Sequence, residues 1–340
     1  MLMSEDLLQI LHRLRRGLRK ARMCAVLLLI FCYGPAVAAD DYPSRVIRLI
    51  IPAPAGGPAD VVGRLYAKHL SKLAGQPVVV ENPGGASGVI GVGMVMRAEP
   101  DGYTILLGTT STVAGINHLF MKDLPYEYAR DFATIGLIAN APHVLAVRSS
   151  LPARNLTEFV ALAKQSPGKY TFASAGPGTI VQMGGELVKY HAGIDILHVP
   201  FRGGAPATMA VIAGDVDMTV NDLTTLDAHF KSGKLRPLAV ASARRIKPIP
   251  DIPTFAELGM PKIISSTWWG IAVPKAAPAS IQSKLRTMHV KILADTEFLS
   301  QLEAIGVEPL NLTPEQIPVF IHDDTQKWKE VAAAAKIPRD

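Results

Sequence analysis

The chain has 340 residues, of which 49% are hydrophobic and 19% are charged, and its net charge at pH 7 is +6. This length and composition are typical of a globular protein with two domains. Residues 1–39 hold six of the 35 basic residues and two of the 29 acidic ones, so the rest of the chain has a net charge of only +2. Nothing then argues for nucleic-acid binding, because the basic cluster is confined to the first residues.

Residues 1–39 have the pattern of an export signal. A basic segment precedes the apolar run 23–33, Gly34-Pro35 interrupts that run, and an Ala-Val-Ala cleavage motif follows. The apolar run is shorter than the roughly 20 residues that a membrane-spanning helix needs. We therefore predict a signal peptide that is cleaved near Ala38 or Ala39, and an exported mature protein.

Both cysteines, Cys24 and Cys32, lie within this leader. The mature chain then has no thiol to form a disulfide, to bind a metal or to act as a nucleophile. Such a composition tolerates an oxidising compartment, which agrees with export. The basic segment is long for a signal peptide, so either Met1 or Met23 is the start of translation.

The mature chain begins with a predicted strand, a glycine turn and a helix. The apolar run 46–51 has the length of a buried strand, and the two prolines that follow it end the strand. Gly56-Gly57 allows a tight turn and leaves backbone N–H groups uncovered where the helix 58–73 starts. Free N–H groups at a helix N-terminus form a site for an anion. Asp60, in the first turn, is expected to cap this helix rather than to contact a ligand.

The same pattern continues along the chain. Strands are predicted at 77–81 and 103–107, a helix at 89–98, and polar loops at 82–88 and 108–112. Three successive β-loop-α units are typical of a parallel, doubly wound sheet, in which ligands bind at the carboxyl ends of the strands.

A linking stretch, 126–139, separates this series from a second one. The second series has predicted strands at 143–147, 170–173, 196–199, 216–220 and 235–241, and predicted helices at 156–164, 181–191 and 205–212. The chain then returns through a strand at 268–273 and ends in helices at 278–294, 297–304 and 314–335.

We therefore predict an α/β fold in which two doubly wound sheets form two lobes joined by a two-strand hinge. After the signal peptide 1–39, the first lobe comprises 40–142 and 268–340, and the inserted second lobe comprises 143–267. Two lobes on such a hinge form a clamp that closes on a ligand.

Most enzyme classes lack support in the sequence. There is no dinucleotide-binding fingerprint and no phosphate-loop lysine motif. Neither Ser87 nor Ser174 lies in a G-x-S-x-G motif, and no two histidines are spaced i, i+4 as on a metal-binding helix. We predict no catalytic residue, no cofactor and no metal.

Arg202 is the charged residue of greatest interest. It lies in a glycine-flanked loop at a predicted strand end, where its guanidinium can bind a carboxylate through two hydrogen bonds. A solvated loop arginine is an equal alternative. Trp268 and Trp269 lie at the second chain crossing and either pack in the core or form an aromatic wall of the cleft. His198 either faces the cleft or is structural.

Taken together, these motifs resemble the periplasmic solute-binding receptors of tripartite tricarboxylate transporters, the Bug-type proteins. The resemblance spans about 42–337. The motifs that carry it are Pro52-x-Pro54-x-Gly56-Gly57-x-x-Asp60, Glu81-Asn82, Pro100-Asp101-Gly102-Tyr103, His198-Val199-Pro200-Phe201-Arg202-Gly203 and Gly214-x-Val216-Asp217.

The resemblance implies a two-lobed periplasmic-binding-protein fold, type II-like, that closes on a small carboxylate without catalysis. It implies a ligand among the di- and tricarboxylates, aromatic acids or acidic amino acids. The implied partners are a large and a small integral membrane subunit of the transporter, and a monomeric state is expected. The alternatives are a ligand sensor for a membrane signalling partner and a periplasmic hydrolase.

The family's ligand-binding loops map onto five segments of this chain. The candidate ligand-binding residues are Ala55, Gly56, Gly57, Asp60, Asn82, Ala86, Ser87, Thr109, Thr110, Ser174, Gly178, Thr179, Phe201, Arg202, Gly203, Asn221 and Asp222. The order Asn221-Asp222 is the reverse of the usual one, Ala59 replaces a hydroxyl residue, and Gln182 replaces a histidine. These departures leave the ligand open.

Overall fold

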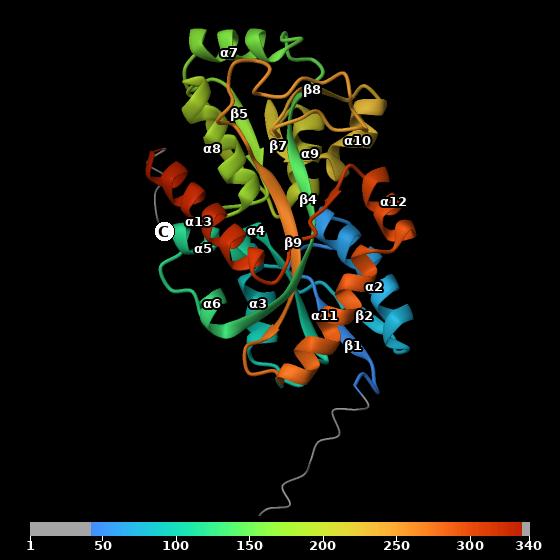
Figure 1. The fold of residues 1–340 in the computed structure, drawn as a ribbon. Helices are drawn as coiled ribbons and strands as arrows, with labels where there is room; N and C mark the ends of the chain where they lie inside the picture. The colour runs from blue at the N-terminus through green and yellow to red at the C-terminus, as the bar shows by residue number, and fades with distance from the viewer. Residues whose placement is uncertain (1–41, 335–340) are drawn as a thin grey trace, which may run out of the picture. The chain divides into compact units, whose positions relative to one another are not determined.

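The computed structural model describes residues 42–334, and the predicted signal peptide lies outside the described residues. From Pro43 onward the chain forms one compact unit with a mixed α/β architecture (Figure 1). Its strands form a curled ten-stranded sheet with the order β2-β1-β3-β9-β4-β7-β5-β6, and β8 and β10 pair with β4 off this path.

The first β-loop-α units form as predicted. The strands β1 (Ile47–Ile50), β2 (Val78–Glu81) and β3 (Thr104–Thr109) pair in parallel. The helix α2 (Pro58–Ala74) ends at Gly75, which has a φ of 64° and supplies the left-handed C-cap. The helix α3 (Val89–Met96) follows the second loop. These elements place the loops that follow β1 and β3 at the same edge of the sheet.

The second series forms a matching parallel group. The strands β5 (Thr171–Ser174), β6 (Leu197–Pro200) and β7 (Met218–Asp222) pair in parallel. The helix α7 (Leu156–Gln165) precedes β5, and α8 (Ile180–Ala192) and α9 (Gly204–Ala213) lie between the three strands. Asn155 caps α7 by accepting a hydrogen bond from the Glu158 N–H. β8 (Leu235–Val240) pairs antiparallel with β4.

Two predictions in this region are wrong. The linking stretch 126–139 contains the short helix α6 (Tyr128–Asp131) and the first part of β4 (Phe132–Arg148), which is 17 residues long. β4 is buried along most of its length, so its sequence lacks the alternation by which a half-exposed strand is found. The second error is α10 (Leu223–Lys231), a helix that was not predicted after β7.

Two long strands connect the two groups of strands. β4 pairs with β9 (Ser266–Pro274) up to Pro142 and then with β7 from His143 onward. β9 also pairs antiparallel with β3. Trp268 and Trp269 on β9 are both 1% exposed, so they pack in the core and do not form a wall of an open cleft.

The C-terminal helices cover the sheet and add a third connection. α11 (Ala279–Leu293), α12 (Thr296–Ala304) and β10 (Glu308–Pro309) lead to α13 (Gln316–Ala334). Ile317 at the start of α13 packs in the core of the first strand group, whereas Trp328 and Val331 pack in the core of the second. Nothing in the sequence pattern indicates that this helix contributes to both cores.

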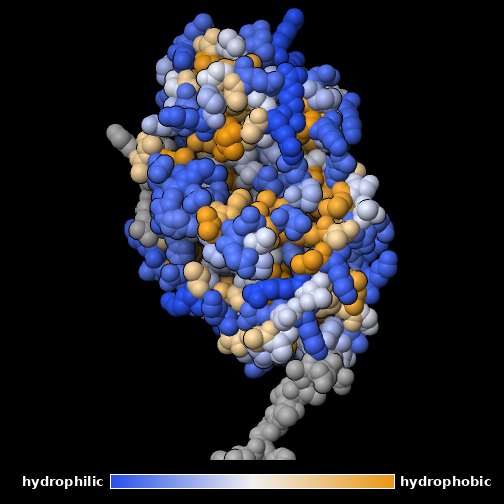
Figure 2. Space-filling view, viewed as in Figure 1, coloured by the Kyte–Doolittle hydropathy of each residue, from blue (hydrophilic) through white to orange (hydrophobic). Residues whose placement is uncertain are grey.

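Figure 2 shows a mainly hydrophilic face with smaller hydrophobic areas. No helix within 42–334 combines the length and the apolar character needed to cross a bilayer.

Candidate functional site

The loops that follow β1 and β6 lie against each other. Gly203 has a φ of +122°, and a Cβ built on it would lie 3.1 Å from Cγ of Pro54. These two residues are far apart in sequence and belong to loops that end strands in different groups of the sheet. The loops at the ends of β1 and β6 therefore meet.

The loop after β1 is held by its own helix. The N–H of Gly56 donates to Oδ2 of Asp60 at 2.8 Å, and Nε of Arg64 donates to the same carboxylate at 2.9 Å. Burial alone would raise the pKa of Asp60, but the bonds from Arg64, Gly56 and Asn82 together lower it. Asp60 therefore stays ionised and fastens the turn.

The glycine N–H groups of these loops are less free than predicted. Besides the Gly56 bond, the N–H of Gly57 donates to the Pro54 carbonyl at 3.3 Å. Gly178 donates to Oε1 of Gln182 at 2.9 Å, and Gly203 donates to the Ala175 carbonyl at 3.2 Å. The prediction that the glycine turn after β1 leaves its N–H groups uncovered is therefore wrong.

The loop after β2 reaches toward the second group of strands. Its Ala86 and Ser87 have φ values of 45° and 50°, in the left-handed region that non-glycine residues rarely adopt. Oγ of Ser87 donates to the Pro177 carbonyl at 2.6 Å. The preceding Asn82 donates to the Ala53 carbonyl at 3.1 Å, which ties this loop to the one after β1.

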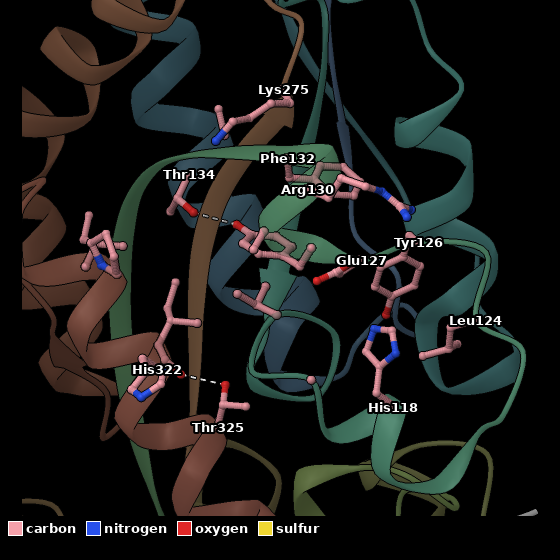
Figure 3. A pocket seen from close by; sticks show the side chains of 18 of the residues that line it. His118, Leu124, Tyr126, Glu127, Arg130, Phe132, Thr134, Lys275, His322 and Thr325 are labelled. Atoms are coloured by element: carbon pink, nitrogen blue, oxygen red, sulfur yellow. Dashed lines mark hydrogen bonds between the residues drawn. The ribbon is translucent and has the colours of Figure 1, made fainter.

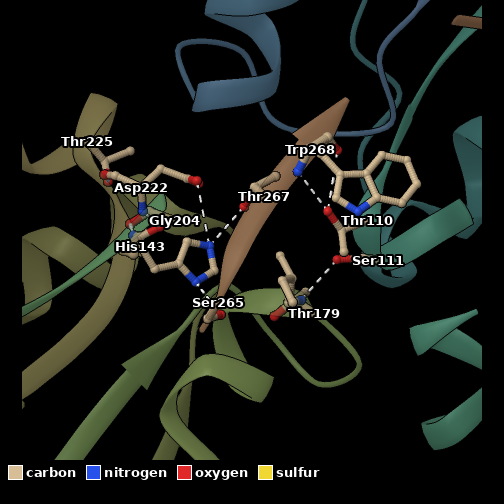
Figure 4. Close-up of polar contacts among 12 residues, drawn as sticks. Thr110, Ser111, His143, Thr179, Gly204, Asp222, Thr225, Ser265, Thr267 and Trp268 are labelled. Atoms are coloured by element: carbon tan, nitrogen blue, oxygen red, sulfur yellow. Dashed lines mark hydrogen bonds and ion pairs between the residues drawn. The ribbon is translucent and has the colours of Figure 1, made fainter. Parts of the chain in front are cut away.

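The loop after β3 is shorter than predicted. β3 continues to Thr109, which caps α4 (Thr110–Val113) together with Thr112. Oγ1 of Thr110 accepts a hydrogen bond from the N–H of Trp268 at 2.8 Å, on the connecting strand β9. Oγ of Ser111 accepts one from the N–H of Ile180 at 3.0 Å, at the start of α8 (Figure 4). Ser111 thus bridges the two groups of strands.

The segment between β5 and α8 is a network of hydroxyl contacts. Ser174 is fully buried, and its Oγ lies 2.6 Å from Nε2 of His198 and accepts from the Gly176 N–H at 3.1 Å. Thr179 donates to the Gly176 carbonyl at 2.7 Å. Burial, with a smaller effect of Lys189, lowers the pKa of His198 to about 4, so its imidazole is neutral at neutral pH.

A buried polar cluster lies where β4, β7 and β9 meet. Nε2 of His143 is 3.0 Å from Oγ1 of Thr267 and 3.6 Å from Oδ1 of Asp222, and Nδ1 is 2.9 Å from Oγ of Ser265 (Figure 4). Burial raises the pKa of Asp222 to about 7 and lowers that of His143 to about 3. The sequence analysis did not predict this cluster. The signal that could have indicated it is His143, a histidine within an otherwise apolar strand.

The residues next to this cluster position the β6 loop. Nδ2 of Asn221 donates to the Gly204 carbonyl at 3.1 Å and to Oγ1 of Thr208 at 3.3 Å. Phe201 is partly buried against the neighbouring core. Arg202 is exposed, and its side chain has no hydrogen bond or ion pair to any residue that the structure describes. Its guanidinium is therefore available to an anion at the place where the loops meet.

The described residues thus bring most of the predicted site residues to loops that touch one another. Their contact with a ligand stays a prediction. No group of His, Asp and Glu side chains within 42–334 is arranged to hold a metal ion.

Comparison with known proteins gives several matches over most of the chain. Residues 62–337 match the family described as tripartite tricarboxylate transporter family receptor. Protein BugT of Bordetella pertussis is 34% identical over 295 residues, which is 87% of this chain and 90% of BugT. The structure of R. palustris Rpa4515 with adipate has a TM-score of 0.83 and 31% identity, covering 88% of this chain and 100% of that one. MatC from Rhodopseudomonas palustris with bound malate has a TM-score of 0.79 and 27% identity, covering 85% and 99%.

Proposed function

Because this chain belongs to the tripartite tricarboxylate transporter receptor family, we propose that it captures a small organic carboxylate between its two lobes and delivers it to a membrane transporter. The observation that carries the proposal is the meeting of the strand-end loops, where Gly203 lies against Pro54 and the neighbouring Arg202 is unpaired. Two proteins of the same fold were solved with adipate and with malate, both of which are dicarboxylates.

In this proposal Arg202 supplies the principal positive charge for the ligand. A guanidinium binds a carboxylate through two parallel N–H···O bonds, which gives both affinity and orientation. Further donors come from the hydroxyl groups and the remaining backbone N–H groups of the loops. Asp60 and Asn221 act indirectly, because their hydrogen bonds hold the loops in place.

We propose that the ligand is bound and released without chemical change. Two serine–histidine contacts lie among the described residues, Ser174 with His198 and the fully buried Ser265 with His143. Burial lowers the pKa of His143 to about 3, and both contacts are poorly suited to nucleophilic catalysis. A base with a pKa of about 4 removes a serine proton weakly at neutral pH, and Ser174 is fully buried. This argument disfavours the periplasmic hydrolase.

The proposal includes the cellular setting that the family implies. The protein would be exported by its N-terminal signal, would act in the periplasm as a monomer, and would meet one large and one small integral membrane subunit. The mature chain's near-neutral charge agrees with capture of a free small molecule rather than a polyanion.

The test compares two exposed arginines, Arg202 and Arg154, by titration calorimetry with adipate, malate, glutamate and nicotinate as probes. Arg202→Ala should weaken binding of the best probe by about 1–3 kcal/mol, the scale of a charged hydrogen bond left unmade. Arg154→Ala, on the loop before α7, should leave the affinity unchanged. Equal affinities for the wild-type protein and Arg202→Ala would place Arg202 outside the site.

A further inference from the structure

A hollow lies on the molecule beside α4, which directly follows β3. It is a groove of about 1040 Å³ between α13, the region of α5 (Ile116–Phe120) and α6, and the start of β4 (Figure 3). None of the candidate ligand-binding residues lines it. Its volume is just above the range for small-molecule pockets, about 300–1,000 Å³.

The lining of the groove is partly aromatic and apolar. Tyr126 and Tyr128 are buried, and the Tyr128 ring stacks on Phe132 with 5.4 Å between centroids. Ile317 and Ile321 contribute from α13. Apolar walls of this kind favour a ligand with a hydrocarbon or aromatic body.

The charged residues that line the groove are mostly cationic. Lys275 and Lys329 are exposed and form no ion pair within 42–334, and Arg286 is the third cation. Arg130 also lines the groove, but Asp131 accepts two hydrogen bonds from it. Glu127 is the one acidic residue among the described lining residues. The balance favours an anionic ligand.

Arg286 gives a more specific indication. Its Nε is buried and has no hydrogen-bond acceptor among the described residues. Its Nη2 reaches the Thr134 carbonyl and Oε1 of Gln282 only at 3.4 Å each. A buried donor of a cationic group is costly to leave unpaired. Arg286 as a whole is only partly buried, so its guanidinium charge can act on an anionic group in the groove.

From the groove, its cationic lining and the unpaired Arg286 Nε, we propose a second ligand site, for an organic anion that carries an apolar or aromatic body. The anionic group lies near Lys275 and Arg286, and the body lies along Tyr126, Tyr128 and α13. This site is separate from the proposed interlobe site.

The test uses 8-anilinonaphthalene-1-sulfonate, an aromatic sulfonate whose fluorescence rises when it leaves water. It is titrated into the wild-type protein and into Lys275→Glu, Arg286→Gln, Arg202→Ala and Lys164→Glu. Lys164 is an exposed lysine on α7, outside the groove, and controls for the change in net charge. Because Lys275 is exposed, Lys275→Glu is expected to fold, and melting temperatures check each variant.

The proposal predicts saturable binding at one site, weakened about tenfold or more by Lys275→Glu and by Arg286→Gln. Lys164→Glu and Arg202→Ala should retain the wild-type affinity. Absence of saturable binding, or equal affinity in Lys275→Glu and the wild-type protein, would overturn the second site. Weakening by Arg202→Ala alone would also overturn it, since the probe would then occupy the interlobe cleft, and the proposed function would stand.

Discussion

The hydroxyl group of Ser111 accepts a hydrogen bond from the backbone N–H of Ile180 at 3.0 Å, which ties the loop after β3 to the first residue of α8. Ser87 makes a second tie of the same kind, to the Pro177 carbonyl. Both bonds join loops from the two strand groups that β4 and β9 connect. Contacts of this type would stabilise the closed arrangement of a two-lobed receptor around its ligand.

Ser111→Ala should therefore weaken carboxylate binding. When the loops meet, the substitution leaves the buried Ile180 N–H unpaired, at a cost of about 1–3 kcal/mol. Calorimetric titration measures the loss. Ser283→Ala, at an exposed serine on α11, serves as the control and should bind as the wild-type protein does. A full wild-type affinity in Ser111→Ala would mean that this bond does not contribute to closure.

Gly203→Ala should reduce both stability and binding. A φ of +122° is a conformation that only glycine adopts easily, and the new Cβ would press on Pro54 across the loop contact. We expect a loss of about 1–3 kcal/mol in the free energy of unfolding. Gly214→Ala is the control, because Gly214 has a φ of +87° but nothing lies within 4 Å of its built Cβ. Only Gly203→Ala should lower ligand affinity; equal affinities in the two variants would contradict the loop contact.

The pair of Asp222 and His143 gives a pH-dependent prediction. Burial raises the pKa of Asp222 from 3.8 to about 7, so its contribution to folding stability is present at low pH and is lost as the pH rises through this range. Burial lowers the pKa of His143 from 6.5 to about 3, so its contribution changes in the opposite sense, and stability increases as the pH rises. The two effects offset each other between roughly pH 4 and 6.5.

Asp222→Asn removes the contribution of Asp222 and leaves that of His143. The free energy of unfolding of the variant, relative to the wild-type protein, should then rise by up to about 1.4 kcal/mol per pH unit between roughly pH 4 and 6.5. Urea denaturation at several pH values measures this difference directly. Parallel pH profiles for the two proteins would show that Asp222 is not protonated in the folded state.

Trp328 tests the role of α13 in the second core. It is fully buried, and its indole N–H has no acceptor among the described residues. Trp328→Ala should cost about 3–5 kcal/mol of unfolding free energy through the cavity that it leaves. Trp328→Phe should cost much less, because a ring still fills most of the space and the unpaired donor is removed. Similar losses in the two variants, measured by urea denaturation, would contradict this account.

Much of the fold could be predicted because local signals agreed with the final structure. The Pro58 start and the Gly75 end of α2 both follow from backbone preferences of single residues. β4 was harder to predict from the sequence, because it contains Pro142 and a proline normally argues against a strand. That proline stands where β4 leaves its pairing with β9 and begins its pairing with β7.

The site was predictable only as a set of loops. The segments around Gly56, Ser87 and Arg202 could be identified because each follows a predicted strand. In a doubly wound sheet, ligands bind at the carboxyl ends of the strands. The sequence does not show which hydroxyl group forms a hydrogen bond with which backbone group. The bonds of Ser111 to Ile180 and of His143 to Ser265 and Thr267 depend on residues that only the folded chain brings together.

The most direct test of carboxylate capture is a thermal-shift measurement on the exported chain, unfolded and refolded to remove ligand carried from the host. A carboxylic acid present at about 100 times its dissociation constant adds about 2.7 kcal/mol of stability. The account predicts a rise of several degrees in Tm with at least one di- or tricarboxylate, aromatic acid or acidic amino acid, and recovery of that ligand unchanged. An unchanged Tm with every acid of these classes, or a ligand consumed during the measurement, would contradict it.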